Sequence, residues 1–368
     1  MKKVLLVATV QSHICQFHKP LMKLLSENGY EIHVAARNNL AEKDGLSIEY
    51  ASQVFDIHFS RSPFSFRNIS AYNALKKILK ENEYETVHCN TPVGGAIARL
   101  AGNKYRKKGT KIFYTAHGFH FYTGAPIKNW LVYYPIEKIL SHCTDKIVTI
   151  SDEDYFRASK KFSCDTFRLH GVGANTSRFF PISEEEIEKQ KEELGLSGKI
   201  ILNVGELLPN KNQKVAILAM KKVLEKHPNS TLLIAGNGAE KNRLEALIES
   251  ENLQNNVKLL GYKKDIEKYM QVCDLLISCS HREGLGMNLI EAMLCGKPAV
   301  ASSNRGHKEV VKENVNGYLY SADNSSELAE KICKILDSGC LTTDKIINSV
   351  NHFTDTSITK ELKKLYNL

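Results

Sequence analysis

Residues 281–298, HREGLGMNLIEAMLCGKP, form the stretch that decides the fold of this chain. An apolar run at residues 274–278 comes just before it and predicts a buried parallel strand. A helix is expected to begin near Asn288 and to end at Gly296, with Pro298 beyond it as a helix breaker. A strand, a glycine loop and a helix in this order indicate an open α/β sheet that binds ligands at the loop.

The loop inside this stretch has the features of an anion site. Gly284 and Gly286 allow the backbone to approach a ligand closely, and the start of a helix directs free N–H groups at negative charge. Glu283 and Glu291 flank the loop, where they would accept hydrogen bonds from hydroxyl groups attached to the anion. Asn288 and Glu291 also have the spacing of a capping box, which leaves a purely structural role open. A nucleotide sugar has the matching chemistry, and its predicted contacts here are Arg282, Glu283, Gly284, Leu285, Gly286, Met287, Asn288 and Glu291.

Length and composition set the class of protein. A chain of 368 residues, 42% hydrophobic and 25% charged, is long enough for two globular domains. No apolar stretch approaches the roughly 18 residues of a transmembrane helix, and residues 3–10 are expected to form a first strand rather than a signal peptide. Nine cysteines without a C-x-x-C pair predict free thiols in a cytoplasmic protein, with no disulfide framework and no metal site. The net charge of +9 is modest, and no nucleic-acid-binding module is recognisable.

Strand and helix patterns alternate along the chain and restart after a charged stretch at residues 183–194. This alternation predicts an α/β fold with two doubly wound, Rossmann-like domains, comprising residues 1–178 and 179–355. A final helix is expected at residues 356–368.

Further candidate residues follow other predicted strands, where the ligands of parallel sheets bind. Lys211 lies in the loop after residues 199–204, and Gly236 and Gly238 follow residues 231–235. Tyr262 comes after residues 258–260. His117 follows the strand expected at residues 111–116, and the loop after the first strand contains His13 and His18. An ordinary βα turn explains the two glycines equally well, and packing could explain a lone histidine.

Glu283-Gly284-Leu285-Gly286, followed by Glu291 and by Ala292-Met293 with Gly296 and Pro298, resembles the signature of family 4 retaining glycosyltransferases. The resemblance extends along nearly the whole chain and is closest to EpsD-like enzymes of bacterial exopolysaccharide and capsule synthesis. It implies the GT-B fold, in which two Rossmann-like domains face each other across a cleft and a C-terminal helix packs back on the first domain.

The resemblance also implies roles for individual residues. Lys211 would hold the donor diphosphate, whereas Glu206 occupies the position of a family arginine, and Arg282 is the candidate replacement. Glu283 would hold hydroxyls of the donor sugar and Glu291 those of the ribose. His117 would contact the donor sugar near the reacting carbon, and Tyr262 the base. A glycine-rich turn where the acceptor enters is missing from this chain, so His13 and His18 are acceptor candidates only.

The implied reaction is metal-independent and cofactor-free transfer, with retention, from a UDP-sugar to a polyprenyl-diphosphate-linked saccharide. An N-acetylhexosamine is the expected sugar. The D-x-D sequence at residues 152–154 is not interpreted as a metal motif, because acids are favoured at a helix start by the helix dipole alone. Aromatic residues between positions 119 and 140 suggest a peripheral membrane contact, and core packing explains them equally well.

Two other enzyme classes remain open. A UDP-sugar epimerase of GT-B fold would act on the nucleotide sugar without an acceptor. A dinucleotide-dependent oxidoreductase would have related domains, but the first strand is followed by Gln11-Ser12-His13 instead of G-x-G-x-x-G.

Overall fold

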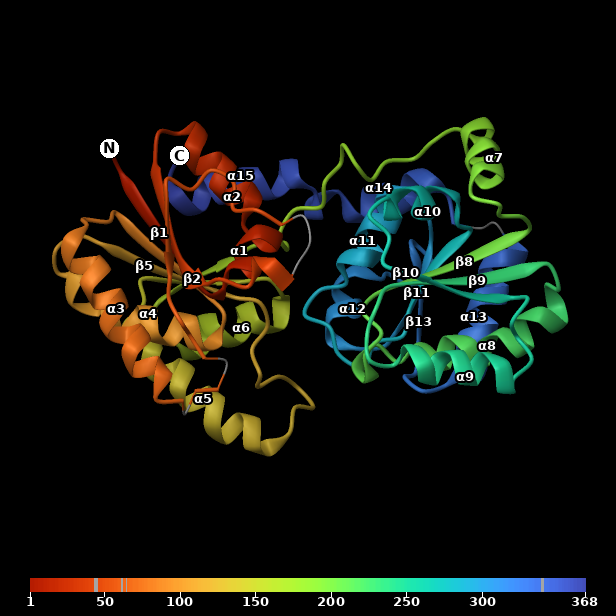
Figure 1. Ribbon diagram of the computed structural model, residues 1–368, viewed down its shortest axis with the longest axis horizontal. Helices are drawn as coiled ribbons and strands as arrows, with labels where there is room; N and C mark the ends of the chain where they lie inside the picture. The colour runs from red at the N-terminus through yellow and green to blue at the C-terminus, as the bar shows by residue number, and fades with distance from the viewer. Residues whose placement is uncertain (43–45, 61, 64, 339–340) are drawn as a thin grey trace. The chain divides into compact units, whose positions relative to one another are not determined.

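The computed structural model describes residues 1–42, 46–60, 62–63, 65–338 and 341–368, and the chain forms two compact units (Figure 1). The N-terminal unit comprises Met1–Gly173 with Thr356–Leu368, and the C-terminal unit comprises Ala174–Asp355. The division falls five residues before the one expected from the sequence. Ala174 explains this difference, because its N–H donates to the carbonyl of Phe353 and its own carbonyl accepts from the N–H of Asp355.

A seven-stranded parallel sheet is the centre of the N-terminal unit. Its order, β3-β2-β1-β4-β5-β6-β7, extends in both directions from β1 and β4, as in doubly wound folds. The strands are β1 (Lys3–Val10), β2 (Glu31–Arg37), β3 (Gln53–Asp56), β4 (Thr86–Asn90), β5 (Lys111–Ala116), β6 (Lys146–Thr149) and β7 (Asp165–Arg168).

Apolar side chains on both faces of this sheet make two cores, because alternate residues of a strand point to opposite faces. Leu5 and Val7 of β1 pack against one group of helices, and Val4 and Leu6 pack against another. The C-terminal helix belongs to the second group, and Figure 1 shows it in blue beside α2. The helices are α1 (Gln11–Phe17), α2 (Lys19–Glu27), α3 (Arg67–Glu81), α4 (Pro92–Arg106), α5 (Ile127–Ser141), α6 (Asp152–Lys161) and α15 (Asp355–Tyr366).

Helix α1 corrects the expectation of an irregular loop after the first strand. The helix begins at Gln11, directly after β1, and buries Ile14 in the core beneath it. The side chain of Gln11 donates to the carbonyl of Ala36. A glycine turn is therefore replaced by a short helix that fixes the position of His13.

A buried ion pair joins α4, α5 and β5. Arg99 is fully buried, and its Nη1 atom lies 2.7 Å from Oε2 of Glu137. The guanidinium group also lies 3.9 Å from the ring centre of Tyr114. Loss of one member would leave an unpaired charge in the core, which is strongly destabilising.

The C-terminal unit contains a six-stranded parallel sheet in the order β10-β9-β8-β11-β12-β13. Its strands are β8 (Lys199–Val204), β9 (Ser230–Ala235), β10 (Val257–Gly261), β11 (Leu275–Ser278), β12 (Ala299–Ser302) and β13 (Gly317–Tyr320). Its helices are α7 (Glu184–Glu193), α8 (Gln213–Lys226), α9 (Lys241–Ser250), α10 (Ile266–Val272), α11 (Met287–Leu294), α12 (Arg305–Val310), α13 (Ser325–Ser338) and α14 (Thr343–Val350).

Each sheet changes direction at one point, between β1 and β4 in the first unit and between β8 and β11 in the second. Crevices at such switch points are the usual ligand sites of open α/β sheets. No helix among the described residues has both the length and the apolar composition needed to cross a bilayer.

Candidate active site

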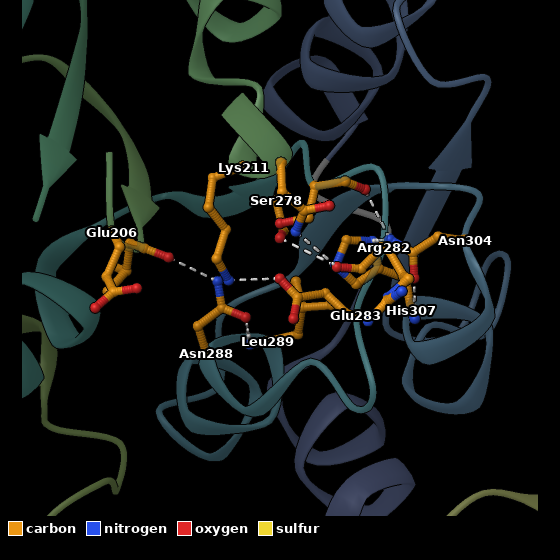
Figure 2. Close-up of polar contacts among 12 residues, drawn as sticks. Glu206, Lys211, Ser278, Arg282, Glu283, Asn288, Leu289, Asn304 and His307 are labelled. Atoms are coloured by element: carbon orange, nitrogen blue, oxygen red, sulfur yellow. Dashed lines mark hydrogen bonds and ion pairs between the residues drawn. The ribbon is translucent and has the colours of Figure 1, made fainter. Parts of the chain in front are cut away.

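Two loops meet at the switch point of the C-terminal unit, one after β8 and one after β11. The N–H of His281 donates to the carbonyl of Asn210 at 2.8 Å, and the amide of Asn210 donates to the carbonyl of Arg282 at 3.0 Å. One residue further along each loop, Nζ of Lys211 lies 2.6 Å from Oε1 of Glu283. Figure 2 shows these two side chains pointing toward each other. The two loops are thus held in register, with a cation and an anion at their meeting point.

The Lys211–Glu283 pair is accessible to a ligand. The two side chains keep 26% and 19% of their accessible surface. The sequence suggested separate partners for them, a diphosphate for Lys211 and sugar hydroxyls for Glu283. In the structure each is the partner of the other, so a ligand would have to exchange this ion pair for its own contacts.

The loop before α11 presents free backbone donors. Within the described part of the chain, the N–H groups of Gly284, Leu285 and Gly286 have no hydrogen-bond acceptor, whereas that of Met287 donates to the carbonyl of Leu285. These three N–H groups are therefore unpaired among the described residues, with Gly284 and Leu285 half-buried and Gly286 buried. The N–H of Met287 is already engaged.

Asn288 and Glu291 do not form a capping box. Helix α11 begins at Met287 after Gly286, with no side-chain cap, so Glu291 lies in the second turn. The Asn288 side chain instead donates to the carbonyl of Val204 at 2.9 Å. This bond fixes the start of α11 against the end of β8.

The side-chain carboxyl group of Glu291 makes no hydrogen bond to the described residues, although Glu291 is half-buried. Burial raises the pKa of its carboxyl group to about 7, and the charge of Arg178 opposes this shift. A partly protonated carboxyl group can both donate to and accept from a hydroxyl. Glu291 is therefore suited to bind a polyol such as a ribose.

The glycines after β9 allow close contact between loops. A Cβ atom on Gly236, whose φ is +148°, would lie 1.9 Å from the carbonyl oxygen of Gly205, and one on Gly238 would lie 2.2 Å from that of Leu207. The carbonyl of Asn237 accepts from the N–H of Leu207 at 2.9 Å. Both glycines thus allow close packing against the loop that contains Lys211. This role fits an ordinary βα turn better than direct contact with the ligand.

Arg282 and Tyr262 lie at the surface. Arg282 is exposed, and its guanidinium group contacts none of the described side chains, which leaves it available to a phosphate. Tyr262 follows β10 with 68% of its surface exposed. The proposed replacement of the family arginine by Arg282 and the contact of Tyr262 with a base remain predictions.

His307 was missed by the sequence analysis. Its Nδ1 atom donates to the carbonyl of Ser302 at 2.8 Å, so Nε2 accepts from the Ser278 hydroxyl at 3.1 Å. Burial lowers its pKa, against the raising effects of the Ser302 carbonyl and Glu283. A Cβ atom on Gly286 would lie 3.3 Å from this ring, so His307 packs beneath the loop and positions it. The one local sequence signal near His307 is the N-cap residue Asn304, and an N-cap indicates the start of a helix rather than a site.

The three histidines predicted in the N-terminal unit come together at its switch point. His13 is on α1, His18 lies between α1 and α2, and His117 follows β5. The ring centres are 4.6 Å apart for His13 and His117 and 5.5 Å apart for the other two pairs. Burial lowers the pKa of His13 to about 4, and burial together with the neighbouring histidines lowers the pKa values of His18 and His117 well below the ordinary value. The sequence assigned these residues to separate ligands, whereas the structure makes them one cluster.

The acids at the start of α6 serve the fold. The hydroxyl of Ser151 caps the helix by accepting from the N–H of Asp154, and the Asp154 carboxylate accepts from the N–H of Phe119. The aromatic residues before α5 are also structural, because Phe119 and Phe121 are almost completely buried.

Two parallel sheets of doubly wound order, with a glycine loop and an acid-flanked helix at the switch point, define a glycosyltransferase of the GT-B type. Two family models match the chain: "Glycosyl transferase 4-like" over residues 3–151 and "Glycosyl transferases group 1" over residues 184–351. The chain belongs to the family 4, EpsD-like glycosyltransferases.

Individual relatives agree with this assignment. EpsD of Bacillus subtilis (strain 168), a glycosyltransferase by name, is 42% identical over 90% of this chain and 86% of its own length. The Escherichia coli UDP-Gal:α-D-GlcNAc-diphosphoundecaprenol α-1,3-galactosyltransferase is 26% identical over 78% of this chain and 79% of its own. Among solved structures, Anabaena Alr3699/HepE in complex with UDP and glucose superposes with a TM-score of 0.79 at 22% identity, covering both chains completely. This structural likeness establishes the shared fold.

Proposed function

We propose that the enzyme transfers a sugar, an N-acetylhexosamine, from a UDP-sugar to a polyprenyl-diphosphate-linked saccharide, with retention and without a metal at the diphosphate. The observation that carries this proposal is the loop after β11, which has three free N–H groups next to the Lys211–Glu283 pair and leads into helix α11 with Glu291 in its second turn. This set offers donors to a diphosphate and acceptors to hydroxyls on either side of it.

The leaving diphosphate gains negative charge as the glycosidic bond to it breaks. Fixed donors aimed at that charge stabilise the transition state, and the N–H groups of Gly284, Leu285 and Gly286 are such donors. Lys211 would exchange Glu283 for the diphosphate, and Arg282 would add a second cation. The freed carboxylate of Glu283 would then accept hydrogen bonds from the sugar, while Glu291 binds the ribose. The contact of His117 with the donor sugar stays a prediction.

The names of relatives support the substrate classes. The Escherichia coli relative uses UDP-Gal and a diphosphoundecaprenol-linked acceptor and makes an α-linkage. A Staphylococcus aureus relative, 29% identical over 46% of this chain, is a poly(ribitol-phosphate) α-N-acetylglucosaminyltransferase. The likeness to EpsD supports a place in exopolysaccharide synthesis.

A lipid-linked acceptor requires an approach to the membrane, for which α5 is suited. Its side chains Ile127, Leu131 and Ile139 expose 77%, 72% and 66% of their surface, and Lys128 and Lys138 are exposed on the same helix. Aliphatic side chains beside cations fit the surface of an anionic bilayer. The peripheral contact is therefore proposed for the aliphatic face of α5 rather than for the buried aromatic residues before it.

The test is UDP release from a panel of UDP-sugars by the full-length protein, with and without a lipid-diphosphate saccharide and with a metal chelator present. Acceptor-dependent UDP release from one UDP-sugar, unaffected by the chelator and lost in Lys211→Ala but not in the exposed control Lys214→Ala, is expected. Isomerisation of the UDP-sugar without an acceptor would instead identify an epimerase. Binding of NAD but of no UDP-sugar would identify an oxidoreductase.

A further inference from the structure

The histidine cluster of the N-terminal unit contains polar atoms that nothing in the described structure satisfies. The Nε2 atoms of His13, His18 and His117 are all buried and have no hydrogen-bond partner among the described residues. The His18 side chain is almost completely buried, with 5% of the residue exposed. Buried polar atoms normally have partners, so three unpaired nitrogens at one place indicate a missing ligand.

The geometry of the cluster suits a metal ion. One ring nitrogen from each histidine lies within 4.8 Å of the other two. Three nitrogens that bind zinc at roughly 2.0–2.1 Å in a tetrahedral site are about 3.3 Å apart, so small rotations of the rings would close the site. Neutral imidazole is the commonest metal ligand, and an unpaired ring nitrogen is the atom through which it binds a metal.

The surroundings of the cluster leave room for one more ligand. A cavity of about 20 Å³ borders His18 and His117, and a site of this size holds a single water molecule. The nearby ring of His88 is not available as a fourth ligand. Its Nδ1 atom lies 2.7 Å from the hydroxyl of Tyr366, and its Nε2 atom lies 2.6 Å from that of Thr115.

We propose that His13, His18 and His117 bind one zinc ion through three imidazole nitrogens, with a fourth position open to water or another ligand. Three histidines and one open position are a known ligand set for zinc. This site lies within the N-terminal unit. Its existence does not depend on the proposed function, and zinc bound to His117 would take the place of the donor-sugar contact predicted for that residue. The proposed site differs from the expectation, drawn from cysteine spacing, that the chain has no metal site.

The experiment measures zinc bound to the chelator-treated, full-length protein by equilibrium dialysis with metal analysis, for wild type, His13→Ala, His117→Gln and the exposed-histidine control His58→Ala. One zinc per chain is expected in wild type and His58→Ala. The affinity should fall in the two cluster variants by more than the roughly 10–100-fold that loss of an outer-shell partner costs.

Two further readouts separate metal binding from a folding defect. Thermal unfolding without metal shows whether each variant folds, and added zinc should raise the unfolding midpoint of wild type and His58→Ala only. Cobalt(II) in place of zinc should give the intense visible absorption of a four-coordinate ion. The proposal is overturned if folded wild type binds no zinc, or if the cluster variants bind it as tightly as wild type.

Discussion

The two sheets of this enzyme have the same strand order, but the residues at their switch points differ in chemistry. At β8 and β11, glycine loops, free N–H groups and the accessible Lys211–Glu283 pair lie at the ends of the strands. At β1 and β4, a short helix and three imidazoles with buried Nε2 atoms occupy the corresponding position. One topology thus supports two kinds of site, because the loops and not the sheet supply the chemistry.

The largest effect is expected from breaking the core of the N-terminal unit. Glu137→Ala leaves Arg99 buried without its counter-ion and should lower the free energy of unfolding by about 3–5 kcal/mol. Denaturant unfolding of the full chain should show this lower free energy of unfolding as an earlier unfolding transition of the N-terminal unit. An equal shift in both units would show that they do not unfold separately.

The next effect sharpens the role of the C-terminal switch point. Lys211→Met should reduce the rate of transfer by about 10²–10³-fold, or ~3–4 kcal/mol in the barrier, because one donor to the leaving diphosphate is lost. Steady-state kinetics would measure this, with Lys214→Met as the exposed control on α8. A rate within a few-fold of wild type would remove Lys211 from the catalytic site.

The raised pKa of Glu291 should make the stability of the C-terminal unit depend on pH. Its folded pKa of about 7 lies above the ordinary value of 4.5, so between these values the folded state binds more protons than the unfolded state. Stability should therefore fall as pH rises from about 4.5 to about 7 and stay level above that, with a total on the order of 2–3 kcal/mol. Unfolding of wild type and Glu291→Gln at pH 5 and pH 8 checks this. An unchanged pH dependence in the variant would assign the effect to another group.

The smallest effect concerns the bond that fixes the start of α11. Asn288→Ala removes the hydrogen bond to the carbonyl of Val204 and should cost about 1 kcal/mol of stability. A loss of donor affinity larger than the loss of stability would show that this bond also positions the loop. Thermal unfolding and UDP titration on the same samples distinguish the two.

The central strands could be predicted closely from the sequence because they are apolar runs with polar ends. β1, β5 and β8 begin and end where the pattern indicates. Strand β3 has no such signal, since it is short and mostly exposed, and α1 is a short, largely polar segment whose helix depends on burial of Ile14. The family signature supplied candidate site residues one by one, and their roles stay predictions.

Contacts between distant residues could not be predicted in the same way. Lys211 and Glu283 are 72 positions apart. His13 is on α1 and His117 follows β5, so only the fold brings the members of each group together. His307 lacked any local pattern typical of a site. The role of His307 in the site comes from its ring, which packs beneath Gly286.

The central claim is that a UDP-sugar exchanges the Lys211–Glu283 pair for its own contacts. Calorimetric titration of UDP and of the donor UDP-sugar into wild type, Lys211→Met and Glu283→Gln tests it most directly. Lys211→Met should weaken both ligands, whereas Glu283→Gln should bind UDP at least as tightly as wild type, because Lys211 is freed, and should lose the extra affinity for the sugar. Equal weakening of UDP in both variants, or no binding of UDP to wild type, would contradict the account.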